Sequence, residues 1–418
     1  MKKGLLAAGV VIALATIPLH ASTAKHRALA ELAKNPPKEI AVMPSLKILL
    51  DKETSEAFVE VKGGYKIYDP RTGQQLGRGL LGKSFNVEAM PTGIKWGEEF
   101  PGIYQVAIIP ASGTAFKVNG VPFKGSLLVY QIGHHLSLVN EVSVEDYVKS
   151  TLAASIDTSF PQEVICALAI AARTEAYYKR MTTQEAFWQL DADEIGYSGM
   201  PNAKDSVKIN EAVDTTRYLV MQSAEDFAAK GLFPAQWTAN SAGKTAPYHV
   251  MHRTEVIGPR RGVEAAYANH DRKESSWTLS MKKNELAQLV GLEHVTKVSL
   301  YTDSFSEKVY NIRFYDDKKS KDMDYFTFQK LVGLDKLPSS DFTVAMTNES
   351  ISFAGFGQGP GIGLCLYSAE KMAEQGANAV QILTKFFPET QLVIMPTLPL
   401  KSESIAKVQS LIMTKVKN

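Results

Sequence analysis

The change of hydrophobic pattern at Val144 is the feature that most limits how this chain can fold. Before it, from about residue 39 to 142, short alternating apolar segments are separated by turn residues, which is typical of small antiparallel sheets. After it, residues 144–152 and 161–180 carry apolar residues at helical spacing, and Pro161 suits the first turn of the second helix. Strands followed by helices predict an α+β fold, a core of helices and antiparallel strands with a β-rich N-terminal region.

The β-rich region has clear turn signals. A hairpin over residues 117–123 is the best-defined element, because Asn119-Gly120 suits a two-residue turn between alternating strands. The other strands that we expect here are 40–42, 46–50, 57–61, 65–68 and 127–130. A polar helix over Lys25–Asn35 precedes them and ends at Pro36-Pro37.

The C-terminal half alternates between strands, loops and short helices. Residues 237–248 read as the end of a strand followed by a Ser/Gly/Thr-rich loop. We expect short helices at 280–289 and 327–331, and a glycine-rich loop at 355–363 that opens a helix over 364–375, capped by Gly376. The division predicted for the whole chain is a signal peptide (1–24), a linker or helix (25–38), a β-rich domain (39–141), a second domain (142–395) and a tail (396–418).

The N-terminus resembles a secretory signal. Lys2 and Lys3 precede an apolar run over 5–19, and small residues follow at 21–24. This pattern predicts export to the periplasm or cell-wall compartment, with cleavage after Ala21 or Ala24. An uncleaved signal anchor is the alternative, although the run is shorter than the roughly 20 residues that span a bilayer. A cytoplasmic protein with a fortuitous apolar start is the third interpretation.

Composition narrows the class of partner. The 418 residues are 45% hydrophobic and 22% charged with a net charge of +2, so no strong field attracts nucleic acid. The two cysteines, Cys166 and Cys365, exclude a multi-cysteine zinc site. They could form a single bridge, but buried small hydrophobic residues are the favoured interpretation. Nothing in the sequence calls for a cofactor.

Three segments, in order, follow one recognisable pattern. The first runs from Val142-Ser-Val-Glu145-Asp146-Tyr147 through Ser155-Ile-Asp157 and Phe160-Pro161 to Ala171-Ala-Arg173-Thr174. The second is Asn240-Ser241-Ala-Gly243-Lys244-Thr245, and the third is Gly355-Phe-Gly357-Gln-Gly359-Pro360-Gly361-Ile-Gly363. Together they resemble the sporulation stage II protein D / LytB (amidase enhancer) family over about residues 130–395. The resemblance implies a cell-wall protein whose partner is peptidoglycan.

The resemblance also implies a missing catalytic group. Active family members are understood to be lytic transglycosylases, and the family's catalytic Glu falls on Ser155, whose hydroxyl is too weak an acid to replace a carboxyl group. Asp157 is the nearest surrogate acid, with Glu163 and Asp146 as more remote options. Two further departures are Pro360 in place of a His and Leu366 in place of a Gln, beside the retained aromatic Tyr367.

The same three segments supply the candidate substrate-binding residues. By resemblance these are Tyr147, Phe160, Arg173, Ser241, Gly243, Lys244, Thr245, Gly357, Gly359, Gly361, Gly363 and Tyr367, with Trp237 as a further aromatic near them. The glycines would let either a sugar chain or a neighbouring strand approach the backbone. A phosphate cradle is disfavoured because the P-loop Lys-Ser/Thr is absent. Arg173 can instead be a structural partner of Glu145 or Asp146.

Two histidine pairs could suggest metal binding. His249 and His252 have the i, i+3 spacing of one helix face, but no third ligand is evident, so a hydrogen-bonded or exposed pair is favoured. His134 and His135 are expected on a strand, where they would point to opposite faces. We therefore predict no metal.

Three functions remain open. The leading hypothesis is a protein that binds peptidoglycan glycan strands and assists cell-wall remodelling, with impaired or altered transglycosylase activity. The first alternative is an active lytic transglycosylase on denuded glycan strands that uses Asp157 or another acid. The second is an interaction protein that docks a cell-wall amidase or division protein through the β-rich region. Membrane contact is expected only through an uncleaved signal.

Overall fold

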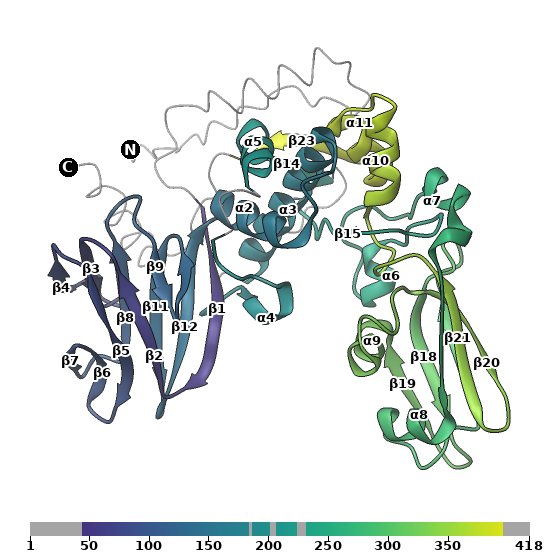
Figure 1. The fold of residues 1–418 in the computed structure, drawn as a ribbon, viewed down its shortest axis with the longest axis horizontal. Helices are drawn as coiled ribbons and strands as arrows, with labels where there is room; N and C mark the ends of the chain where they lie inside the picture. The colour runs from purple at the N-terminus through teal and green to yellow at the C-terminus, as the bar shows by residue number, and fades with distance from the viewer. Residues whose placement is uncertain (1–43, 184–185, 201–205, 224–230, 396–418) are drawn as a thin grey trace, which may run out of the picture.

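A computed structural model describes residues 44–183, 186–200, 206–223 and 231–395 (Figure 1). The predicted signal, the helix over 25–35, the strand over 40–42 and the tail after 396 lie outside the described residues. Within the described residues, no helix has both the length and the apolar character that crossing a membrane requires.

Two antiparallel sheets pack face to face at the N-terminal side (Figure 1). The first has the strand order β13-β1-β12-β11-β8-β3-β4, with only the β13–β1 pair parallel. Its strands are β1 (Ser45–Thr54), β3 (Tyr65–Tyr68), β4 (Gln75–Gly79), β8 (Gln105–Pro110), β11 (Ser126–Ile132), β12 (His135–Ser143) and β13 (Leu190–Asp191). The second, in the order β10-β9-β2-β5-β6-β7, contains β2 (Glu56–Val61), β5 (Lys83–Met90), β6 (Gly93–Trp96), β7 (Glu98–Pro101), β9 (Phe116–Val118) and β10 (Val121–Phe123).

The predicted hairpin at 117–123 is confirmed as β9–β10. Asn119 and Gly120 both have positive φ, 49° and 86°, which is the requirement of the two-residue turn whose twist matches the strands. The other predicted strands in the described range, at 46–50, 57–61, 65–68 and 127–130, are also present. In β2 the alternating residues bury one face, whereas β1 and β11 are buried on both faces, by the main core and by a smaller cluster that includes Leu49, Leu128 and Tyr130.

A layer of helices continues the same core (Figure 1). Ser143 caps α2 (Val144–Ser155) by accepting a hydrogen bond from the Asp146 backbone. The Ala-rich α3 (Gln162–Thr182) is buried without interruption from residue 164 to 174, so it lies inside the core. Around it lie α4 (Ala192–Ile195), α5 (Val207–Thr215), β14 (Leu219–Ser223), α10 (Leu366–Glu374), α11 (Ala379–Phe386) and β23 (Thr390–Ile394).

A second hydrophobic core is formed by residues between 246 and 362, apart from a stretch over 257–268 that packs against the first core. It is built from two three-stranded antiparallel sheets and short helices, at the lower right of Figure 1. The elements are α6 (Tyr248–His252), the 3₁₀ helix η2 (Arg272–Ser275), β16 (Ser276–Lys282), α8 (Lys283–Val290), β17 (Lys297–Thr302), β18 (Val309–Tyr315), β19 (Ser320–Asp324), α9 (Tyr325–Val332), β20 (Asp341–Met346) and β21 (Ser350–Phe356). The short helix α7 (Ala266–His270) falls in the same stretch of sequence but packs against the first core through Ala268.

Two main segments connect the two cores, although residues 257–268 between them also pack against the first core. The chain leaves the first core after β15 (Trp237–Thr238) and returns through β22 (Leu364–Cys365), and these two short strands pair in parallel. The predicted domain boundary at 141–142 lies within β12, near the start of α2, and both elements contribute residues to the first core. The division into domains stays a prediction.

Four local predictions need correction. The helix expected at 280–289 starts only at Lys283, because Ser280, Met281 and Lys282 pair with β21. Gly355 belongs to β21, and the helix expected at 364–375 starts at Leu366 after a short strand. Pro161 is the residue before α3, with an extended ψ of 145°. His134 lies in the β11–β12 turn rather than on a strand. The helix predicted at 327–331 is confirmed within α9.

Candidate functional site

The two crossing segments are bonded to each other, and we call residues 236–246 and 357–367 the junction loops. Asn240 and Gln358 exchange backbone hydrogen bonds of 2.9 and 2.8 Å. The Ala246 N–H donates to the Gly361 carbonyl at 2.7 Å, and the Tyr367 N–H donates to the Ala239 carbonyl at 3.0 Å. The second and third sequence segments, more than a hundred residues apart, thus form one structural unit.

The glycines of the third segment make room for the facing chain. A Cβ on Gly363 would lie 2.1 Å from the Gln236 carbonyl oxygen, and one on Gly357 would lie 2.4 Å from the Asn240 carbonyl oxygen. Both residues also have positive φ, 66° and 84°. Of the two interpretations offered by the sequence, the contacts thus favour approach of a neighbouring strand.

Gly363→Ala should lower the free energy of unfolding by about 3 kcal/mol, because left-handed strain and a backbone clash add together. Gly133→Ala is the matched control: its φ is 62°, and no atom lies within 4 Å of its added Cβ. That control should cost about 1 kcal/mol. Urea unfolding of both variants measures the difference, and equal costs would contradict the packing described for Gly363.

A buried ion cluster fixes the second-core side of the junction loops. The Asp341 carboxylate accepts hydrogen bonds from Lys308 Nζ at 2.6 Å and from two nitrogens of Arg272 at 2.8 and 2.9 Å. Lys308 also donates to the Ser241 carbonyl at 2.7 Å, and Arg272 donates to the Ala242 carbonyl. Burial lowers the pKa of the Lys308 ammonium group, whereas Asp341 opposes that shift. The cluster therefore holds the backbone of one junction loop in place.

The predicted binding residues on these loops divide by exposure. Ser241, Gly243, Thr245, Gly357 and Gly361 are buried, whereas Lys244, Gly359, Gly363 and Tyr367 reach the surface. The Tyr367 hydroxyl donates to the Asp271 carboxylate, and this bond raises the pKa of the tyrosine to about 12. Lys244 Nζ lies 5.1 Å from the ring centre of the exposed Phe305. The accessible face of the junction loops thus carries aromatic rings, an ammonium group and a carboxylate.

The candidate catalytic residues, Ser155 and Asp157, lie between α2 and the N-terminal end of α3. Ser155 ends α2 and is exposed, and the exposed Asp157 uses a carboxylate oxygen to accept the Ser159 N–H at 2.8 Å. The Phe160 carbonyl accepts a hydrogen bond from Lys208 of α5. The Glu163 carboxylate binds the first N–H of α11, at Ala379. The described contacts of this segment lead to α5 and α11, so they do not bring Ser155 or Asp157 to the junction loops.

Two further candidate residues are enclosed by the first core. Arg173 has 0% exposure and forms a two-point ion pair with Glu145 at 2.9 and 2.8 Å. Its remaining donors bind core carbonyl oxygens, including Leu219 and Val213. Tyr147 is 7% exposed, with its ring 6.1 Å from that of Tyr197. The geometry supports the structural role of Arg173 that the sequence allowed, with Glu145 rather than Asp146 as its partner.

One member of the histidine pair on α6, His252, has a packing role that the spacing did not suggest. The His252 ring is stacked between Tyr248 and Phe326, with ring centres 4.1 and 4.4 Å away. Burial, reinforced by the positive charge of Lys179, lowers the pKa of His252 to about 4. In the described part of the chain, no group of three or more His, Cys, Asp or Glu residues is arranged to hold a metal ion.

Acid should weaken the fold through His252. Its folded pKa, about 4, is below the ordinary 6.5, so its contribution is complete above pH 6.5 and is lost as pH falls toward 4. We expect a loss of about 2 kcal/mol after allowing for solvent screening. His252→Phe should flatten this part of the urea-unfolding pH profile. His294→Phe, at an exposed surface pair, should leave the slope unchanged; the same slope in all three proteins would contradict this role.

The sequence did not point to Gln236, which contacts His252, or to Glu175, which Gln236 bonds in turn. Gln236 Oε1 lies 3.2 Å from His252 Nε2, and the Gln236 side chain also hydrogen-bonds the carboxyl group of Glu175 on α3. The signal available in the sequence was the position of Glu175, an acidic residue within a largely buried, Ala-rich helix.

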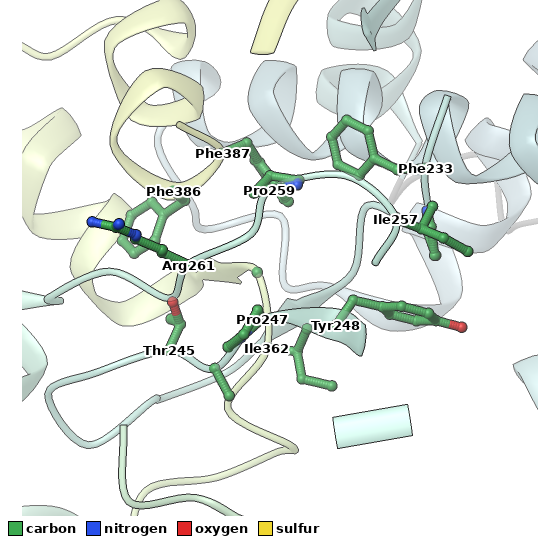
Figure 2. Close-up of a pocket in the computed structure, with 13 residues that line it drawn as sticks. Phe233, Thr245, Pro247, Tyr248, Ile257, Pro259, Arg261, Ile362, Phe386 and Phe387 are labelled. Atoms are coloured by element: carbon green, nitrogen blue, oxygen red, sulfur yellow. The ribbon is translucent and has the colours of Figure 1, made fainter. Parts of the chain in front are cut away.

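A largely apolar pocket opens beside this cluster (Figure 2). Both cores contribute to it: Phe386 and Phe387 come from the end of α11 and beyond it, and Pro247 and Tyr248 come from the start of α6. Arg261 is the charged residue of its lining. Tyr248 belongs both to this pocket and to the stack on His252, so the pocket and the cluster adjoin.

The two cysteines are free and buried, in agreement with the small-hydrophobe interpretation. Cys365 lies at the junction, where its sulfur accepts the Ser241 N–H at 3.3 Å. Cys166 lies within α3.

The fold and site define an α+β protein whose helical core carries a second β-rich lobe, joined by the interlocked junction loops. Residues 133–222 match the family model SpoIID, described as Stage II sporulation protein. The chain belongs to the SpoIID family, and this membership connects it to the bacterial cell wall. The matched range holds the first of the three sequence segments and ends before the junction loops.

Three similar proteins extend the comparison. The chain is 35% identical to a Chlamydia pneumoniae protein over 45% of this chain and 70% of the relative. It is 33% identical to a Chlamydia muridarum protein over 44% of this chain and 64% of the relative. It is 27% identical to a Brachyspira hyodysenteriae protein over 80% of this chain and 89% of the relative. All three are described as uncharacterised, so they supply relatives without an activity.

Proposed function

We propose that this protein binds the glycan strands of peptidoglycan at the junction loops and assists cell-wall remodelling. The observation that carries the proposal is the interlocking of the second and third family-like segments into one surface. The exposed Gln358 and the partly exposed Tyr367 and Lys244 offer an aromatic ring and polar groups, which suit sugar faces and hydroxyls. The proposal places the protein outside the cytoplasm, delivered by its N-terminal signal.

The proposal does not assign catalysis to Ser155. A hydroxyl group cannot donate a proton to a glycosidic oxygen at neutral pH, and Ser155 is exposed at the end of α2. Binding through a retained surface with reduced or altered cleavage is the function that these residues support best.

Co-sedimentation with purified sacculi tests this function. The full chain should sediment with the wall, and Tyr367→Ala combined with Lys244→Ala should weaken binding about tenfold, equivalent to about 1.4 kcal/mol. Tyr104→Ala is the control, because that tyrosine is 44% exposed in the β-rich region, away from the junction. Absence of sedimentation, or equal loss in the control, would defeat the proposal.

A second candidate function rests on Leu80 and Leu81, which are 88% and 82% exposed between β4 and β5. Two adjacent exposed leucines are suited to a protein contact. In this second function, the β-rich region would bind a cell-wall amidase or a division protein. Capture of a purified amidase by the wild type but not by a Leu80→Ser/Leu81→Ser variant would support it; equal capture by both would refute it.

A further inference from the structure

Glu175 is an acidic group of the first core that bonds a junction loop directly, through Gln236. It lies on α3, one turn before Lys179, and its side chain is half-buried rather than enclosed. The Gln236 side chain hydrogen-bonds its carboxyl group. The side-chain oxygen of Gln236, Oε1, lies 3.2 Å from His252 Nε2 and can only accept, so the imidazole donates this hydrogen bond. The side-chain NH₂ of Gln236 is then directed to Glu175.

The same glutamine ties this acid to the glycine-rich segment. The Gln236 backbone carbonyl accepts the Leu364 N–H at 3.1 Å and occupies the space that a Cβ on Gly363 would need. A movement of the junction loops therefore moves the side chain that orients Glu175. The acid and the proposed binding surface form one connected unit.

The surroundings of Glu175 favour its protonated form. Burial raises the pKa of its carboxyl group, while Lys179 and the Gln236 hydrogen bond oppose the shift. The neighbouring His252 is held neutral between two aromatic rings, so it adds no positive charge. A general acid needs a half-buried carboxyl group of this kind, oriented by a fixed partner.

The two acids near the family-like catalytic segment, Asp157 and Glu163, are less well placed than Glu175. From Glu163, which holds the start of α11, to Glu175 is 12 residues of helix, or about 18 Å at 1.5 Å per residue. Asp157 precedes Glu163, is exposed and is used in a local turn. Glu175, in contrast, lies in the C-terminal half of α3, where Gln236 of a junction loop bonds its carboxyl group.

We propose that Glu175 is the proton donor for cleavage of a glycosidic bond in a glycan strand bound at the junction loops. This inference rests on the proposed function. The bond from the sugar C1 to the bridging oxygen breaks, and that oxygen takes the electron pair and the Glu175 proton. A hydroxyl of the same sugar or a water forms the new bond to C1 and gives its proton to the Glu175 carboxylate. Gln236 is a positioning residue.

The test compares the full-length wild type with Glu175→Gln and Asp157→Asn. Each protein is incubated with denuded glycan strands, and mass spectrometry detects both anhydro and reducing-end products. We expect slow cleavage by the wild type, a loss of at least about 100-fold in Glu175→Gln, and no change in Asp157→Asn. Co-sedimentation with sacculi should be the same for all three proteins.

The outcomes separate this inference from the binding function. Normal sedimentation with no cleavage by the wild type, or with equal cleavage by Glu175→Gln, overturns the role of Glu175 and leaves binding intact. Loss of sedimentation in the wild type overturns the binding function itself. If Glu175→Gln loses cleavage and also unfolds at lower urea than the wild type, the Glu175→Asp variant decides, because it keeps the carboxyl group. Failure of Glu175→Asp to restore cleavage at the same stability as Glu175→Gln would contradict proton donation.

Discussion

Glu145→Gln is expected to lower the free energy of unfolding by about 3–5 kcal/mol. The substitution keeps the shape of the side chain but removes the charge that faces Arg173. Arg173 has 0% exposure and Glu145 5%, so water cannot replace the lost partner. The guanidinium would remain buried without an anionic partner, because its other acceptors, such as the carbonyl oxygens of Leu219 and Val213, are neutral.

The matched control for this prediction is Asp322→Asn. Asp322 also makes a two-point pair with an arginine, Arg313, at 2.7 Å for each contact, but both side chains are more than a third exposed. Its loss should cost at most about 1 kcal/mol. Urea unfolding of the two variants compares one geometry in two environments. Similar costs would show that burial of Arg173 does not matter as described.

Asp341→Asn should have an effect of the same size, because one carboxylate balances two cations. Lys308 is 1% exposed and Arg272 is half-buried, and both also hold carbonyl oxygens of the junction loop at Ser241 and Ala242. Without the charge of Asp341 the two cations repel each other in a poorly solvated place. We expect a loss of about 3–5 kcal/mol in unfolding free energy and faster amide hydrogen exchange over residues 240–246.

A double-mutant cycle with Lys308→Met tests the cause. Methionine keeps the apolar stem of Lys308 and removes its charge. In the Asp341→Asn background this second change should cost less than in the wild type, or even restore stability, because it removes an uncompensated ammonium group. Strict additivity of the two substitutions would contradict the coupling of these charges.

Local chemistry explains which elements could be predicted. The β9–β10 hairpin depends on Asn119-Gly120, and the burial of α3 depends on its own run of small apolar residues. In contrast, Ser280–Lys282 look helical alone and become strand through pairing with Ser350–Ser352, about seventy residues away. Such long-range pairing leaves no mark in a short window of sequence.

The candidate site shows the same limit. The sequence supplied the glycine spacing of the third segment, and it allowed for a neighbouring strand at those glycines, which the structure favours. It could not show that Gln236 links Glu175 to His252, because the three residues come from different elements and meet only when the two cores dock. Nor could it show that a junction loop bonds the C-terminal half of α3, whereas Ser155 lies before its N-terminal end.

Hydrogen–deuterium exchange of the full chain, with and without denuded glycan strands, tests whether glycan binds at the junction loops. We predict slower exchange in the presence of glycan at residues 236–246 and 357–367, with no change over the Leu80-Leu81 loop. Unchanged exchange throughout the chain, or slower exchange confined to the β-rich region, would contradict binding at the junction loops.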